Sequence, residues 1–264
     1  MVRKGQDRLA AGQQEPAPTQ PQSFSVAELR GDLTGAAAQE ALARMGLTPQ
    51  LLTGACAAGL QAAVNQHSSY EPSTAFGYQH WAKTVAALRE ALAEQGWDSR
   101  DILNAPRSVS GDGRFSIAAI RGTAATGQVG ARPTNARARG RVFVDGVAVN
   151  AQFLAGSEAG GGSAADVYGQ HYQPVLGTML ALDVSARSAG DLARLPHTWL
   201  LLYFWDRSDN VVRSELSLPV ACEDGVVTRW RTRIILPPEE LGGLASGQVG
   251  ALPSDDVDFV IQAV

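Results

Sequence analysis

Residues 197–238 read HTWLLLYFWDRSDNVVRSELSLPVACEDGVVTRWRTRIILPP, and this stretch decides the fold class. It contains three runs rich in β-branched and aromatic residues, separated by the turn-forming sequences DRSDN and EDG. Such runs with short polar turns are typical of consecutive antiparallel strands. The first run, 198–205, is apolar at almost every position, which predicts a central strand or one covered on both faces.

The turn between the second and third runs can be chosen by matching the faces of the two strands. A two-residue loop at 224–225 pairs Leu218 with Arg231 and mixes apolar with charged faces. A three-residue loop ending in the same glycine pairs Leu218 with Trp230 and keeps each face uniform. Because a one-residue slip would expose the apolar side chains, we predict the three-residue loop.

This register has consequences for the side chains of the other strands. It places Glu215 opposite Arg233, a cross-strand pair worth roughly 0.2–1 kcal/mol. The aromatic residues of the first run, Trp199, Tyr203 and Trp205, join the arginine-bearing face if the loop DRSDN has all five residues. They join the opposite face if that loop is one residue shorter, and the sequence leaves both alternatives open.

The third run carries Arg229, Arg231 and Arg233 at alternate positions. Alternate side chains of a strand share one face and recur about every 6.6–6.8 Å, which is close to the spacing of phosphates along an extended single strand of nucleic acid. Aromatic side chains beside them would offer stacking platforms for bases. The pattern therefore predicts a face that binds nucleic acid.

A second basic segment lies earlier in the chain. Residues 121–141, RGTAATGQVGARPTNARARGR, carry five arginines and no acidic residue, and we call residues 121–140 the basic loop. Two of its glycines have the separation found in a nucleotide-binding loop, but Gln128 and Val129 stand where that chemistry needs lysine and Ser or Thr. Nucleotide hydrolysis is therefore not expected here.

Turn residues mark a hairpin on each side of the basic loop. One is centred on 111–113 in RSVSGDGRFSIAAIR, and the other on the Asp-Gly pair at 145–146 in RVFVDGVAV. The basic loop is then predicted as a flexible connector between them. A second flexible, glycine-rich loop over 155–164 leads into one helical insertion.

The first 97 residues have a different pattern. Residues 1–24 are rich in Gln, Pro and Ala without periodicity, which predicts a disordered tail. Three periodic apolar runs over 25–97 predict three helices. The middle run carries the small residues Ala55, Cys56, Gly59 and Ala63. These would let a neighbouring helix approach closely.

The whole chain is thus predicted to have an α+β fold. A helical part over 25–97 follows the tail, and a β-rich part over 98–264 contains a mainly antiparallel sheet with one helical insertion. The boundary falls where the apolar period changes from that of a helix to that of a strand.

Composition argues against several other chemistries. The two cysteines lie far apart and no two histidines are spaced i, i+4, so neither a metal site, a disulfide framework nor a cofactor is expected. The basic N-terminal residues precede no apolar signal region, and no apolar run approaches the roughly 20 residues of a membrane helix. We expect a cytoplasmic protein that does not contact membranes.

Two hypotheses of function follow, with a more distant third. The first is a non-catalytic accessory protein that associates with nucleic acid. The second is an adaptor for a protein partner that uses the basic loop and the acidic segment 237–264. The third is a metal-dependent nuclease with Asp206 and Glu215 as carboxylate ligands. The residues predicted to contact nucleic acid are Arg229, Arg231, Arg233, Arg213, Arg132, Arg137, Arg139, Arg141, Trp199, Tyr203 and Trp205.

Overall fold

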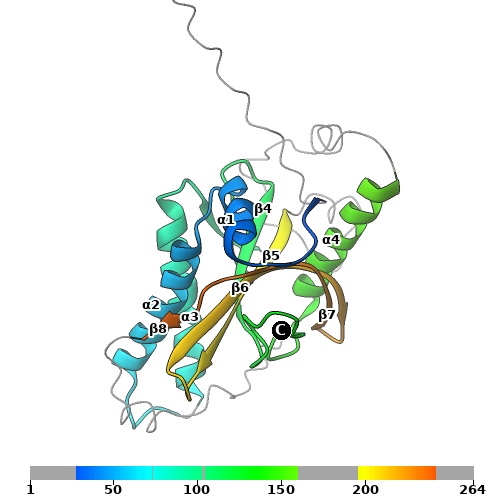
Figure 1. Cartoon of the computed structure of the whole chain (residues 1–264). Coiled ribbons are helices and arrows are strands. Elements are labelled where there is room, and N and C mark those ends of the chain that lie inside the picture. The colour runs from blue at the N-terminus through cyan, green and yellow to red at the C-terminus, as the bar shows by residue number, and fades with distance from the viewer. Residues whose placement is uncertain (1–27, 73, 103–104, 160–195, 242–264) are drawn as a thin grey trace, which may run out of the picture.

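The computed structural model describes residues 28–72, 74–102, 105–159 and 196–241. In this part of the chain, four helices and eight strands form an α+β fold with a mainly antiparallel sheet, as predicted (Figure 1). In chain order the elements are β1 (Gly31–Leu33), α1 (Gly35–Arg44), α2 (Pro49–Gln66), α3 (Ala75–Ala93), β2 (Asp98–Ile102), β3 (Ala105–Val109), β4 (Phe115–Arg121), α4 (Arg141–Ala159), β5 (His197–Asp206), β6 (Val211–Glu223), β7 (Val226–Ile235) and β8 (Glu239–Glu240).

A single sheet forms the centre of the molecule. Its strands follow the order β1-β7-β6-β5-β4-β3-β2, and β8 pairs with β6. The strands β5, β6 and β7 are antiparallel neighbours, and β5 is buried along most of its length, so both predictions for this region are confirmed. The pair β4–β5 is parallel, which requires a crossover connection of the kind that contains α4.

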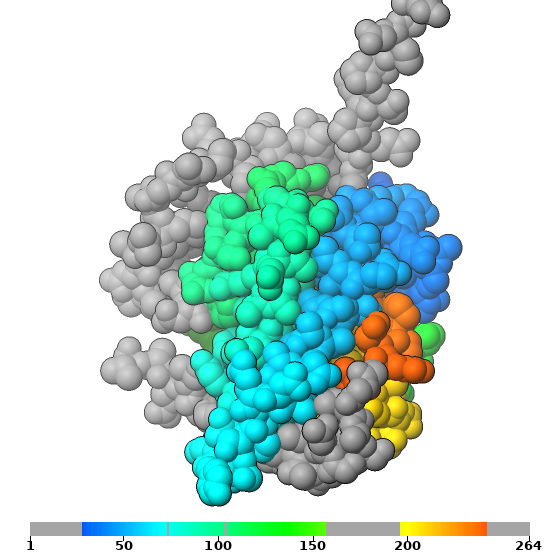
Figure 2. All heavy atoms as spheres, turned by 90° about the vertical axis from the view of Figure 1, so that its left-hand side faces the viewer, coloured from blue at the N-terminus to red at the C-terminus, as the bar shows by residue number. Residues whose placement is uncertain are grey.

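Helices cover both faces of the sheet (Figure 1). On one face, which we call the helical face, α1, α2 and α3 share a buried core with Trp199 and Leu201; Figure 2 views this side of the molecule. On the other, the α4 face, Phe143 and Val147 pack against Leu200. The sheet is therefore the middle layer of three.

The helix α2 begins at a cap that the sequence encodes. The Oγ1 atom of Thr48 accepts a hydrogen bond of 3.2 Å from the N–H of Leu51, and Pro49 occupies the first turn. Further along, α2 meets α3 at Gly59, where a Cβ atom would lie only 2.5 Å from the Cα of Thr84. The prediction that small residues of this helix allow a close neighbour is confirmed.

The hairpin predicted around 145–146 is wrong, because these residues lie inside α4. Phe143 and Val147 are four residues apart, so a helix brings both into the core of the α4 face. Gly146 serves packing rather than a turn: a Cβ atom there would lie 3.1 Å from the Oγ1 of Thr198 on β5. The helical insertion of the described chain is thus α4.

Three other predictions fall wholly or partly outside the described residues. Because α4 continues to Ala159, the loop predicted over 155–164 does not begin before residue 160. Residues 160–164, the helix expected after them and the tail over 1–24 lie outside the described part of the chain.

The three-residue loop predicted between β6 and β7 is also wrong. The turn has two residues, Asp224 and Gly225, both with positive φ (48° and 78°), as in the turns preferred by tight hairpins. Register shifts between Leu218 and Cys222 then move the pairing, so that Leu218 lies opposite Thr232. Bulges, and not the loop, therefore bring the apolar faces of the two strands together.

The loop between β5 and β6 settles the alternative that the sequence leaves open. Pairing ends at Asp206 and Val211, which leaves a loop of four residues, 207–210. The shorter loop places Trp205 beside Val212, so the aromatic side chains of β5 belong to the helical face.

Candidate functional site

Arg233 is a buried anchor of the α4 face. Its Nη2 and Nε donate to the two carboxylate oxygens of Glu215 over 2.6 and 3.0 Å, and its Nη1 donates to Asp32 Oδ2 over 3.0 Å. It also donates to the backbone carbonyls of Ala131 and Gln128 in the basic loop. All five N–H donors of the guanidinium are used, so Arg233 is not retained as a phosphate-binding residue.

The predicted pair between Glu215 and Arg233 is confirmed, but it is buried and not an exposed cross-strand pair. Glu215 is fully buried, and its carboxylate accepts two further bonds, from the N–H of Gly127 and the Oγ of Ser217. Directly opposite Arg233 in the ladder stands Ser217. The pair therefore fixes the basic loop onto the sheet.

The nuclease hypothesis is not supported by the surroundings of its two carboxylates. Glu215 is fully occupied by the contacts just described. Asp206 bonds Arg213 over 2.7 Å and Ser208 over 2.6 Å, and the hydrogen bond from Ser208, followed by the charge of Arg213, holds the pKa of Asp206 below its ordinary value. Across the described residues, no group of three or more His, Cys, Asp and Glu side chains is arranged to hold a metal ion.

The basic loop lies along β7. Trp230 Nε1 donates to the carbonyl of Pro133 over 2.8 Å, Asn135 Nδ2 donates to the carbonyl of Gly225 over 2.9 Å, and the N–H of Arg139 donates to the same carbonyl over 2.9 Å. The loop and the strand thus run side by side although about 90 residues separate them. These contacts bring the two basic segments of the chain together.

We call the arginines of this shared region the basic strip. It comprises Arg132, Arg137 and Arg139 of the loop together with Arg229 and Arg231 of the neighbouring strand β7. The side chain of Trp230 faces the loop, so that of the adjacent Arg229 leaves the opposite side of β7, and the bulge next to Trp230 interrupts the single arginine face that the sequence predicts. The side chains of Arg132 and Arg229 are exposed and form no ion pair or hydrogen bond with the described residues, whereas the other three arginines are partly buried.

Two other predicted arginines are placed differently. Arg141 is exposed at the start of α4, with its Nε 3.4 Å from Asp145. Arg213 pairs with Asp206, and its guanidinium lies over the ring of Phe204 at 5.4 Å from the centroid. Arg213 is therefore engaged within the protein.

The predicted aromatic residues of β5 lie away from the basic strip. Trp199, Tyr203 and Trp205 are between 0 and 4 % exposed, in the core of the helical face. The ring of Tyr203 packs against His80 at 4.9 Å between centroids, and that of Trp205 against Phe76 at 6.1 Å. Because their rings are buried in this core, they offer no stacking platform for bases.

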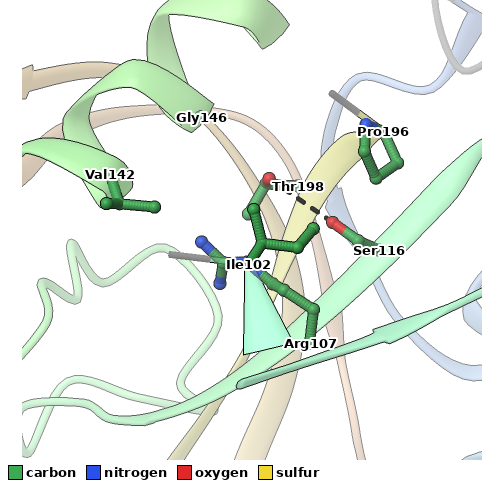
Figure 3. A pocket seen from close by; sticks show the side chains of 7 residues that line it. All are labelled: Ile102, Arg107, Ser116, Val142, Gly146, Pro196 and Thr198. Atoms are coloured by element: carbon green, nitrogen blue, oxygen red, sulfur yellow. Dashed lines mark hydrogen bonds between the residues drawn. The ribbon is translucent and has the colours of Figure 1, made fainter. Parts of the chain in front are cut away.

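Arg107, for which the sequence predicts no role, lines a small pocket. The residue is 6 % exposed on β3, and its side chain reaches towards the first turns of α4 (Figure 3). The pocket is lined by Ile102, Arg107, Ser116, Val142, Gly146, Pro196 and Thr198. One feature of the sequence marks this region as strongly basic: residues 105–141 contain seven arginines and a single acid, Asp112.

The charge of Arg107 has no counterpart nearby. No described carboxylate lies within ion-pair distance, and the charged group that acts on it is another cation, Arg139. Burial, followed by the charge of Arg139, lowers the pKa of Arg107 to about 10. The guanidinium thus remains charged at neutral pH.

No family model, curated protein or solved structure matches this chain. Among the described residues, no helix is both long and apolar enough to cross a membrane. Of the acidic segment 237–264, the described part contains Glu239 and Glu240, which form β8. Any function must therefore be argued from the residues of the chain itself.

His197, next to the pocket, predicts a pH-dependent stability. Burial lowers its pKa from 6.5 to about 4, and Phe153 of α4 packs on its ring at 4.2 Å between centroids. As the pH falls, His197 is protonated first in the unfolded chain. The part of the unfolding free energy that depends on neutral His197 is therefore complete above pH 6.5 and is lost as the pH falls towards 4. The loss amounts to about 3 kcal/mol.

We expect a His197→Gln variant to lose this part of the pH dependence. Urea unfolding of both proteins at pH 7, 5.5 and 4.5 measures it. Equal slopes of unfolding free energy against pH in the two proteins would contradict the assignment to His197.

Proposed function

We propose that the protein is a non-catalytic accessory protein that binds nucleic acid through the basic strip. The observation that carries the proposal is the contact of the basic loop with β7, since the bonds from Trp230 to Pro133 and from Arg139 to Gly225 hold two arginine-bearing segments side by side. A strip of cations drawn from separate segments matches a polyanion better than it matches a single small ligand.

The chemistry of the strip favours phosphate as the group recognised. An arginine fork matches two phosphate oxygens and keeps its charge at any physiological pH. Arg132 and Arg229 are exposed without an ion pair in the described chain. Because the aromatic residues of β5 are buried away from the strip, we propose contact with the sugar-phosphate backbone and little discrimination between sequences.

The test is fluorescence anisotropy with labelled single- and double-stranded DNA and RNA over a salt series. For wild type, the logarithm of the binding constant should fall linearly with the logarithm of the salt concentration. In the double variant Arg132→Gln/Arg229→Gln, the loss of two phosphate contacts should reduce the slope by about 1.4 on a single strand.

A matched control removes the same charge elsewhere. Arg44 and Arg100 are similarly exposed, at 43 and 42 %, and lie outside the strip in α1 and β2. The variant Arg44→Gln/Arg100→Gln should keep the wild-type slope. Absence of binding at 50 mM salt, or slopes that fall equally in both double variants, would overturn the proposal.

A further inference from the structure

We propose that the pocket at Arg107 binds a single phosphate-like oxyanion, with Arg107 as its main cation. This site goes beyond the nucleic-acid association proposed for the strip, and it requires only the residues around the pocket. Figure 3 shows Arg107, Ser116 and Thr198 gathered beneath Val142 and Gly146 of α4.

The first argument is the missing counter-charge. A buried charge is expensive unless it is paired and hydrogen-bonded, and Arg107 is 94 % buried, since its exposed fraction is 6 %. No described group bonds its guanidinium, and the nearby charge of Arg139 has the same sign. Arg233 provides the comparison within the same fold: it is equally buried, but every one of its N–H donors has an acceptor. An anion from solution would supply Arg107 with the acceptor that it lacks.

The second argument is the composition of the pocket walls. The hydroxyls of Ser116 and Thr198, 3.4 Å apart, stand on neighbouring strands and add polar atoms suited to oxyanion oxygens. Val142 and Gly146 belong to the first two turns of α4, where the positive end of the helix dipole favours an anion. The lining residues include no carboxylate. The positive charge of Arg107, the two hydroxyls and the positive end of the helix dipole therefore all favour binding of an anion.

The size of the pocket limits the ligand. The enclosed part of the pocket has a volume of about 10 Å³, which is room for one water molecule. The larger void of about 240 Å³ includes the solvent at its mouth, so a phosphate group would bind at the mouth with one oxygen directed inward, and a whole nucleotide would not enter. The group can be inorganic phosphate or the phosphorylated end of a larger molecule. Arg139, which acts on Arg107, also belongs to the basic strip, so the terminal phosphate of a strand bound there is one of these sources.

The first experiment is thermal unfolding of the full chain as phosphate replaces chloride at constant ionic strength. The melting temperature of wild type should rise with the logarithm of phosphate concentration, because a ligand that binds the folded state stabilises it. Arg107→Met should lose this response, and without phosphate it should melt no lower than wild type, since the variant no longer buries an unpaired charge.

Two further variants separate the site from a general effect of charge. Arg44→Gln removes an exposed arginine of α1, which does not line the pocket, and should keep the full response. Thr198→Val retains the shape of the side chain but removes one hydroxyl, and should weaken phosphate binding about tenfold. A response that persists in Arg107→Met would overturn the proposal.

The second experiment identifies the source of the phosphate group with wild type and Arg44→Gln, and so does not depend on Arg107→Met. Calorimetric titrations use inorganic phosphate, a 5′-phosphorylated oligonucleotide and the same oligonucleotide without the phosphate. A strand end is indicated if phosphorylation tightens binding about tenfold or more. Free phosphate is indicated if it saturates the protein while the two oligonucleotides bind equally.

If inorganic phosphate shows no saturable binding and 5′-phosphorylation has no effect, the pocket is not an oxyanion site. That result would leave the salt dependence of the basic strip untouched. Conversely, a protein that binds phosphate but no nucleic acid would overturn the function proposed for the strip and keep the pocket.

Discussion

The Glu215→Gln variant is expected to unfold with a free energy about 3–5 kcal/mol below that of wild type. Glu215 is fully buried and accepts four hydrogen bonds, two of them from Arg233. Glutamine keeps the shape but removes the negative charge, so Arg233 remains buried with only the carboxylate of Asp32 near it. The loss is a large share of the total stability of an ordinary domain, which is about 5–15 kcal/mol.

Urea unfolding followed by circular dichroism measures this loss. Glu240→Gln is the matched control, because Glu240 is exposed on β8 and should change the stability by no more than about 0.5 kcal/mol. The amide also presents an N–H₂ group where Gly127 now donates, so limited proteolysis should cut the basic loop faster in Glu215→Gln. A Glu215→Gln protein as stable as the Glu240→Gln control would show that the pair does not hold the loop.

The second large effect is expected at the contact between α2 and α3. In Gly59→Ala, the new Cβ would clash with Thr84 Oγ1 and lie 2.6 Å from the backbone nitrogen of the same residue. Because α3 meets this position with its backbone, a change of rotamer cannot relieve the clash and the helices must move apart. We expect a loss at the upper end of the range for overpacking, about 3 kcal/mol.

Gly54 offers a control in the same helix. A Cβ at Gly54 meets no atom within 4 Å, so Gly54→Ala should stabilise the protein by about 0.4–1 kcal/mol through the lower entropy of the unfolded chain. Melting temperatures of the two variants should therefore shift in opposite directions. A shift of Gly59→Ala in the same direction as Gly54→Ala would refute the close approach of the two helices.

The core helices and strands were predictable because their signals are local. Thr48 and Pro49 mark the start of α2, and the apolar run of β5 requires burial on both faces. The expectation that small side chains in α2 allow a close neighbour also rests on one segment alone. Such patterns depend on the period of a helix or strand, which is a property of the nearby chain.

The prediction of a hairpin at 145–146 was wrong for a physical reason. An Asp-Gly pair favours a tight turn, but this preference is worth little beside the burial of Phe143 and Val147 that a helix permits. Gly146 is better explained by its distance from Thr198, and that distance exists only after α4 has packed on β5.

By itself, the sequence determined the N-terminal helices, the antiparallel strands β5, β6 and β7 and the burial of β5, because these follow from backbone periodicity and apolar burial. Only the tertiary structure decided what the arginines do. Arg233 became an internal anchor, Arg107 became a buried cation without a partner, and the exposed strip formed where the basic loop lies against β7. A charge takes its role from the groups that folding brings to it, and these come from distant parts of the chain.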